Sequence, residues 1–261
     1  AGAIILIIVV LMAIFGPMMC KYSYAEQNMS LRNASPSMDH WFGTDRMGRD
    51  IFVRILFGAR ISLAVGCLAA VINLIVGTIY GGIAGYVGGK VDMVMMRIVD
   101  IIYSVPAMLY IVLIMLIFGA SVVSIMLGIS ITCWIDMARI VRQQVKSLKE
   151  QEFTMAAFVL GASPSRILIK HLLINTMGQI IVTVTLMVPQ AIFTEAWLSF
   201  LGVGISAPMA SWGTLAQDAR QLIMTYPMQT VYPMIAICIT IFSFNFVGEG
   251  LEKALDPKRK R

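Results

Sequence analysis

Six long apolar segments separated by polar stretches constrain this chain more than any other feature of its sequence. A helix needs about 20 mostly apolar residues to cross a bilayer, and these runs are continuous, unlike the alternating pattern of a membrane β-barrel. Hydrophobic residues make up 59% of the chain and charged residues 13%, whereas soluble domains are about 25% charged. The sequence therefore predicts an all-α, polytopic membrane protein of about six transmembrane helices. We expect these helices at about residues 3–19, 61–86, 94–118, 122–135, 172–201 and 231–247.

The chain shows no internal repeat and no low-complexity linker, so we expect one transmembrane domain over residues 1–261. Lys and Arg are enriched in cytoplasmic loops. If both termini are cytoplasmic, thirteen Lys and Arg lie on the inner side and seven on the outer side. This bias predicts an extracytoplasmic loop over residues 21–60, a cytoplasmic loop over residues 139–171 and a cytoplasmic tail over residues 250–261.

The polar segment at residues 139–171 carries an unusual run of small residues. We expect a short helix over residues 151–160, a turn at Gly161 and a second helix beginning at Pro164. Glu152, at the start of the first helix, favours its dipole. A corner with so few side chains lets a partner approach the backbone closely.

Four glycines recur at four-residue spacing in and after the second apolar segment, namely Gly77, Gly81, Gly85 and Gly89. Such spacing places small residues on one face of a helix, where another helix can approach closely in a membrane. We expect this stripe to pack within the bundle or against a partner subunit. A sliding surface is the alternative.

Three acidic residues lie within or beside the apolar segments, and such residues are candidates for function because charge is costly in hydrocarbon. We expect Asp100 to pair with nearby Arg97, and Asp136 with nearby Arg139. Glu195 has no basic neighbour in sequence, so it faces an interior cavity or caps a re-entrant turn.

Two prolines, Pro106 and Pro189, interrupt the third and fifth apolar segments. They kink helices, or they mark broken helices that shape a transport pathway. Together with Glu195 they are the candidate pathway residues.

No catalytic, nucleotide or metal site is predicted on this chain. The glycine-containing segment at residues 43–50 lacks the Gly-Lys-Ser/Thr ending of a phosphate loop. We interpret it as a turn in which Thr44 or Asp45 caps a helix beginning near Arg46. The only histidines, His40 and His171, fall on opposite sides of the membrane, and the four cysteines are scattered singly. The positive net charge has its sources in loops and a tail, so no nucleic-acid partner is expected.

Five ordered sequence blocks resemble a known family. The Ala156-Ala157 pair, followed by Gly161-Ala162-Ser163, is similar to the EAA loop of ATP-binding-cassette (ABC) importer permeases. Met155 departs from that motif where its name implies glutamate, and Ile174 stands in place of its usual proline. The other blocks resemble the C-type permease subunit of oligopeptide, dipeptide and nickel importers. They comprise residues 42–45, 48–50 and 58–62; Asp100 with residues 104–106; residues 195–202 with Pro208 and residues 211–213; and residues 244–245, 248–251 and 254–257.

The resemblance implies a multi-pass subunit of the bacterial cell membrane that is not itself an enzyme. In this family a coupling helix on the cytoplasmic loop docks into an ATPase subunit. The residues that match this function are Glu152, Met155, Ala156, Ala157, Gly161, Ala162 and Ser163.

The implied partners are a homologous second permease, two ATPase subunits that bind ATP and Mg, an extracytoplasmic substrate-binding protein and membrane lipids. This chain itself would hold no cofactor. Oligopeptides are the expected cargo, and dipeptides or nickel chelates are the alternatives. A stand-alone secondary transporter or channel is the alternative class.

Overall fold

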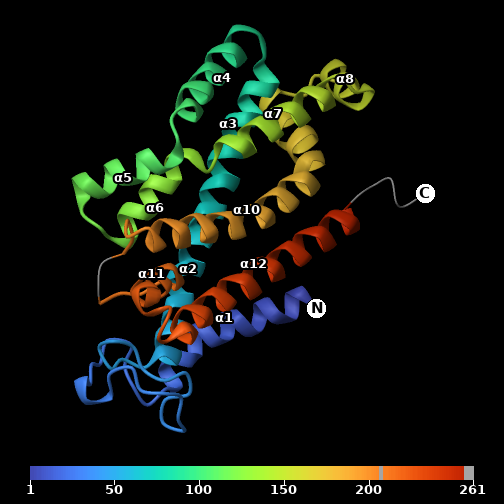
Figure 1. The fold of residues 1–261 in the computed structure, drawn as a ribbon. Helices are drawn as coiled ribbons and strands as arrows, with labels where there is room; N and C mark the ends of the chain where they lie inside the picture. The colour runs from blue at the N-terminus through green and yellow to red at the C-terminus, as the bar shows by residue number, and fades with distance from the viewer. Residues whose placement is uncertain (206–207, 256–261) are drawn as a thin grey trace.

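The computed structural model describes residues 1–205 and 208–255, and within them it is a bundle of helices (Figure 1). Five helical segments are long and apolar enough to cross a membrane, and a sixth is a bent pair of helices. The all-α, polytopic prediction is confirmed. The described residues form no β-strand beyond an isolated bridge between Thr44 and Asp50.

The first and last spans, α1 (Gly2–Met19) and α12 (Pro227–Leu255), lie side by side (Figure 1). They run in opposite directions, because Gly2 packs against Ser243 and Phe246 near the end of α12. The chain therefore begins beside the last turns of α12. The predicted tail at residues 250–261 is helical as far as Leu255, and its remaining residues lie outside the described part.

The second span is a continuous rod made of α2 (Ile51–Ile72), a π-helical segment (Asn73–Gly77) and α3 (Thr78–Val87). It begins ten residues earlier than the apolar run suggests. The expected cap by Thr44 or Asp45 is wrong, since the Asp50 side chain accepts a hydrogen bond from the Val53 N–H at 2.9 Å. The preceding loop therefore ends at Asp50.

Two arginines in the first three turns of α2 interrupt its apolar run, so hydropathy alone places the beginning of this helix too late. Arg54 is buried among carboxylates. Arg60 donates to the backbone carbonyls of Ala13 and Ile14 at 2.6 Å. Both charges are satisfied inside the fold, so they do not end the helix.

The third span is broken into α4 (Gly89–Ser104) and α5 (Ala107–Phe118), which are bent by 75° relative to each other. Pro106 stands at the break. A proline disfavours helical geometry in the residue before it, and Val105 is extended, with φ −94° and ψ 125°. The third apolar segment is therefore two helices rather than one.

The next helices are α6 (Val122–Thr132), α7 (Ile135–Lys149), α8 (Glu152–Val159) and the single turn α9 (Pro164–Arg166). The polar segment predicted to start at residue 139 therefore begins within α7, which continues the fourth span. A π-helical segment (Ile167–Leu173) leads into α10 (Ile174–Phe200). A short helix, α11 (Trp212–Ala219), precedes α12, and 3-10 turns lie at Met29–Leu31 and Arg220–Leu222.

Three glycines of the predicted stripe form the contact between the α2–α3 rod and α7. A Cβ on Gly77 would lie 2.6 Å from that of Met137, and one on Gly85 would lie 2.7 Å from the Arg142 carbonyl oxygen. A Cβ on Gly81 would overlap the Ala138 carbonyl. Gly89 does not belong to this face, because it follows the end of α3 with φ +56° and no described atom lies within 4 Å of a Cβ there.

Candidate functional site

The corner between α8 and α9 forms as the sequence predicts. The N–H of Ala162 donates to the carbonyl of Ala157, and the N–H of Gly161 donates to that of Phe158, both at 3.0 Å. These two bonds form a Schellman motif, whose central residue adopts positive φ. Gly161 has φ +80°, and the Ser163 side chain then caps α9.

The predicted coupling residues divide between two faces of this corner. Ala157 and Ala162 face inward and pack with Val145, Ile167 and Leu172 in an apolar cluster. The outward-facing members are Glu152, Met155, Ala156, Gly161 and Ser163. The two inward alanines are small because they seat α8 on the bundle.

The most exposed apolar residues of the corner are not among the coupling residues predicted from the sequence. Phe158 is 72% exposed, Val159 83% and Leu160 86%. The sequence does contain a signal for this surface, because three consecutive large apolar residues follow the alanine pair on a loop expected to be polar. We define the α8 surface as Met155, Phe158, Val159 and Leu160.

A group of ion pairs lies beneath this corner, between α4 and α7. The Asp92 carboxylate accepts hydrogen bonds from both Arg142, with one bond of 2.7 Å, and Lys146, at 3.1 Å. Lys149 donates to the backbone carbonyl of Tyr86 at 2.6 Å. These contacts fix α7, which carries α8, to the turn between α3 and α4.

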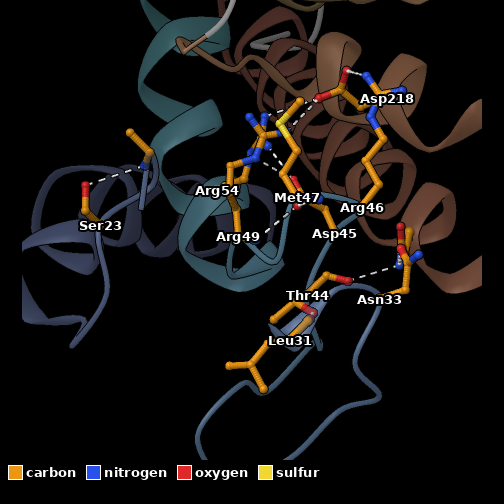
Figure 2. Close-up of polar contacts among 12 residues, drawn as sticks. Ser23, Leu31, Asn33, Thr44, Asp45, Arg46, Met47, Arg49, Arg54 and Asp218 are labelled. Atoms are coloured by element: carbon orange, nitrogen blue, oxygen red, sulfur yellow. Dashed lines mark hydrogen bonds and ion pairs between the residues drawn. The ribbon is translucent and has the colours of Figure 1, made fainter. Parts of the chain in front are cut away.

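At the opposite end of the molecule, buried charges join the loop before α2 to α11 (Figures 1 and 2). Arg54, 2% exposed, contacts Asp45 at 2.5 Å and Asp218 at 3.3 Å. Arg49 contacts the same two carboxylates at 2.7 and 3.3 Å, and Arg46 reaches Asp218 at 3.7 Å. We call these five residues the ion-pair cluster.

The cluster changes the acidity of Asp45. Burial by itself raises the pKa of this carboxyl, but Arg54, Arg49 and the backbone N–H groups of Arg49 and Met47 outweigh it, so the pKa lies below its usual value. The carboxylate is therefore held in its charged form. The residues of the cluster come from sequence blocks on which the family resemblance rests, or lie close to them. Asp45, expected from the sequence to cap a helix, instead holds two arginine side chains.

A cavity of about 490 Å³ lies between the α2–α3 rod, the α4–α5 break, α6, α7 and α10. Of the three predicted pathway residues, Pro106 lines it, whereas Pro189 and Glu195 do not. Pro189 is buried within α10. The side chains that line the cavity at its polar positions are Asn73, Tyr103, Ser104, Thr132, Asp136, Gln190 and Thr194.

Glu195 is 0% exposed and lies near the end of α10, where it does not line the cavity described above. It accepts hydrogen bonds from Ser199 at 2.7 Å and from Ser62 at 3.1 Å. These hydroxyls satisfy a carboxyl group inside the packed interior. Its position favours a structural role in joining α2 to α10.

The predicted partners of the other two acids are wrong. Asp100 contacts Arg139 at 3.1 Å rather than Arg97, and the Arg139 guanidinium also lies 4.4 Å from the ring centre of Tyr103. Asp136 consequently has no ion pair among residues 1–205 and 208–255. The described part also contains no group of three His, Cys, Asp or Glu side chains placed to hold a metal ion.

Comparison with known proteins identifies the family. Residues 77–261 match a family model described as the inner membrane component of binding-protein-dependent transport systems. Residues 1–36 match the N-terminal transmembrane domain of oligopeptide transport permease C. A chain of the MetNI methionine ABC transporter in inward-facing conformations shares the fold, with a TM-score of 0.62 and 17% identity over 79% of this chain and 96% of that one.

Curated relatives agree with the family models. The oligopeptide transport system permease protein OppC of Bacillus subtilis is 51% identical over 260 residues, which cover 100% of this chain and 85% of that protein. The dipeptide transport system permease protein DppC of the same organism is 47% identical, with coverage of 100% and 82%. OppC of Escherichia coli is 43% identical, with coverage of 99% and 86%. The chain therefore belongs to the oligopeptide and dipeptide branch of the ABC importer permeases.

Proposed function

We propose that this chain is the subunit through which oligopeptides cross the bacterial cell membrane, delivered by an extracytoplasmic binding protein and driven by separate ATPase subunits. The identity of 51% to an oligopeptide permease over the whole chain carries this proposal. Dipeptides are the second candidate cargo, because a dipeptide permease is 47% identical. The chain would hold no cofactor, and ATP and Mg would bind to the ATPase subunits.

The α8 surface is the proposed contact with an ATPase subunit. Large exposed apolar patches in a folded protein mark interaction sites, and Phe158, Val159 and Leu160 are all mostly exposed. The same corner rests on α7 and on the segment that leads into α10. A force applied to α8 would therefore reach two membrane spans as a rigid-body movement.

The proposed topology places both termini and the α8 corner on the cytoplasmic side. Two contacts support placing the termini and the α8 corner at one end of the molecule. Gly2 packs near Phe246, which brings the beginning of the chain to the second half of α12. Gly178 lies near Leu255, which brings the end of α12 to the start of α10, just after the α8 corner. The loop over residues 20–50 lies at the other end (Figure 1). That loop and α11 would face the binding protein, with the ion-pair cluster holding their shape.

The proposed translocation path includes the cavity beside Pro106. The break at Pro106 opens the third span where α4 turns into α5, and polar side chains from the α2–α3 rod, α4, α6, α7 and α10 line the cavity there. Pro189 and Glu195 would support this wall from within α10 rather than contact the cargo. A homologous second permease would complete the path.

The test is to purify the complex through this chain, reconstitute it in liposomes with its binding protein, and measure uptake of a labelled tetrapeptide. We expect a second permease and two ATPase subunits to copurify and uptake to require ATP. Uptake that survives ATP depletion by a lone chain would contradict the proposal and favour a secondary transporter or channel.

A pair of glycine variants tests the coupling role directly. Gly161→Glu should abolish ATP-driven uptake while leaving the bundle folded. Gly119→Glu is the matched control, because Gly119 also has positive φ, +83°, and open space around it, but lies in the turn between α5 and α6. Equal uptake by the two variants would remove the coupling role from the α8 corner.

A further inference from the structure

A chain of hydrogen bonds crosses three helices near the end of α10. The Ser62 hydroxyl of α2 donates to the Glu195 carboxyl group of α10 at 3.1 Å, and its oxygen accepts the backbone N–H of Trp212 at 3.4 Å. Ser62 and Glu195 are both 0% exposed. Trp212 is the first residue of α11, where N–H groups have no partner within the helix. One hydroxyl therefore connects Glu195 to the beginning of α11.

The direction of the Ser62 hydroxyl is set by Glu195 rather than by its own helix. A serine or threonine inside a helix can donate to the backbone carbonyl four residues earlier. Five others in the described helices do so at 2.6–2.9 Å, namely Ser130, Thr185, Thr194, Thr240 and Ser243. Ser62 donates to Glu195 instead. Because a hydroxyl has one donor and two acceptor sites, this orientation leaves its lone pairs for the N–H of α11.

The beginning of α11 is packed so closely that these bonds define its position. Trp212 is 2% exposed, and its indole N–H donates to the Ile55 carbonyl at 3.0 Å. A Cβ on Gly213 would lie 2.6 Å from the backbone of Ala196, the residue after Glu195. At its other end α11 joins the ion-pair cluster. The start of α11 is therefore joined to α2 and α10, and its end to the loop before α2.

A buried carboxyl group supplies direction rather than packing. Acidic residues within membrane spans are costly and mark functional positions, and well-packed apolar residues often replace buried ionic groups without loss of stability. The two oxygens of Glu195 accept from Ser62 and Ser199, which an apolar side chain cannot do. Ser199 lies on α10 itself, four residues after Glu195. Of these two bonds, only the one from Ser62 reaches another helix.

We propose that Glu195 is a positioning residue for the surface that receives the binding protein. Glu195 orients Ser62, Ser62 holds the N–H of Trp212, and α11 forms part of the receiving surface. This inference deepens the proposed function and rests on it, because it takes α11 to face the binding protein. Loss of the link should weaken productive docking of the binding protein and leave the maximal rate of the docked transporter unchanged.

The test uses the complete transporter in liposomes, with ATP hydrolysis measured against the concentration of binding protein loaded with tetra-alanine. Each titration gives a half-saturating concentration and a maximal rate, both expressed per assembled complex. Hydrogen exchange of residues 211–219 in the same complex, without binding protein, gives an independent measure of how firmly the start of α11 is held.

Ser62→Ala and Ser199→Ala are a matched pair, because each removes a buried hydroxyl that donates to the same carboxyl group. We expect Ser62→Ala to raise the half-saturating concentration by about fivefold, the factor that corresponds to the loss of one hydrogen bond. It should also speed exchange at the Trp212 amide. Ser199→Ala should leave both measurements at their wild-type values.

Variants of Glu195 test whether the carboxyl group acts through Ser62. Glu195→Gln keeps a carbonyl oxygen that can accept from Ser62, so it should stay close to wild type. Glu195→Leu should shift the half-saturating concentration as Ser62→Ala does. The double variant should show no further shift, because both changes interrupt the same chain of bonds.

Three results would overturn the inference. Equal half-saturating concentrations for Ser62→Ala and Ser199→Ala would show that the link to α11 has no special role. A lower maximal rate at an unchanged half-saturating concentration would place the effect of Glu195 after docking. Less assembled complex in Ser62→Ala, with unchanged kinetics per complex, would leave the link a purely structural role. A wild-type complex that does not respond to loaded binding protein would instead contradict the proposed function, and the exchange comparison would still show whether Ser62 holds α11.

Discussion

At the α8 end a short corner rests on small and apolar side chains, whereas at the opposite end the loop before α2 is fixed to α11 by buried ion pairs. The corner shows an apolar outer face, with Leu160 86% exposed. The opposite end turns Arg49 and Arg54 inward onto Asp45 and Asp218 (Figure 2). The α8 end also has an ion-pair group, at Asp92, but that group lies beneath the corner.

This difference follows from what each kind of contact can do. Apolar surface associates without strict direction, so an apolar face can take up a partner at the α8 end. Buried charges demand defined partners, because removing one leaves the other unpaired at a cost of about 3–5 kcal/mol. The ion-pair cluster therefore holds the loop and α11 in one arrangement, as the proposed receiving surface for a binding protein requires.

The largest expected effect is on the glycine contact that carries the α8 corner. Gly81→Leu should prevent accumulation of folded protein, because its Cβ would overlap the Ala138 backbone, which cannot move aside as a flexible side chain can. Overpacking with movable neighbours costs about 1–3 kcal/mol. The measurement is the yield of monodisperse protein in detergent. Gly82→Ala is the control, since its Cβ would lie 3.4 Å from the nearest atom, in the Leu173 side chain, which is an ordinary contact distance. Equal yields would show that the stripe is incidental.

The next largest effect should come from the ion-pair cluster. Arg54→Met should lower the melting temperature and reduce thermal stability by about 3–5 kcal/mol, because Asp45 loses a buried partner. Lys21→Met is the control, since Lys21 and Asp39 form an exposed pair at 3.5 Å. An exposed pair contributes about 0–1 kcal/mol. Similar melting temperatures for the two variants would contradict a structural role for the cluster.

The cluster should also respond to acid. The pKa of Asp45 is lowered in the folded protein, so its stabilisation is complete above the ordinary aspartate pKa of about 3.9. It is lost as the pH falls through the lowered value. Limited proteolysis of the loop over residues 20–50 should rise in that range. In the Asp45→Asn variant, proteolysis of this loop should be the same above and below that pH range, because the titrating carboxyl is gone. If the variant still became more sensitive to protease in acid, Asp45 would be excluded as the cause.

The smallest effect on the protein itself is expected at the α8 surface. Phe158→Ser should change stability by no more than about 0.5 kcal/mol, because the side chain is mostly exposed. It should nevertheless lower the amount of ATPase subunit that copurifies. Leu116→Ser, at an equally exposed apolar position on α5, is the control. Equal copurification with both variants would place the ATPase contact elsewhere.

Local patterns in the chain determined a large share of this architecture. Continuous apolar runs fix the number and order of the spans, since each must satisfy its backbone hydrogen bonds within a helix. The turn between α8 and α9 could also be predicted from the sequence, because Gly161 is a local signal for a helix end and Ser163 for a helix start. The glycine spacing in the α2–α3 rod predicted a close helix–helix contact, but the spacing does not say which helix makes it. The structure shows that this helix is α7.

Only the tertiary structure decided which charges meet. Arg54 and Asp218 are 164 positions apart in the chain. Arg139 pairs with Asp100 rather than with Asp136, although Asp136 is closer in the sequence. The predicted beginning of α2 was wrong for the same reason. Arg54 and Arg60 interrupt the apolar pattern, and only the packed structure shows that both have partners inside the fold. Helix formation depends on neighbours a few residues away, whereas the pairing of a buried charge depends on which helices pack together. The sequence therefore determined the spans and the corner, and the packing of the spans determined the ion-pair cluster and the cavity.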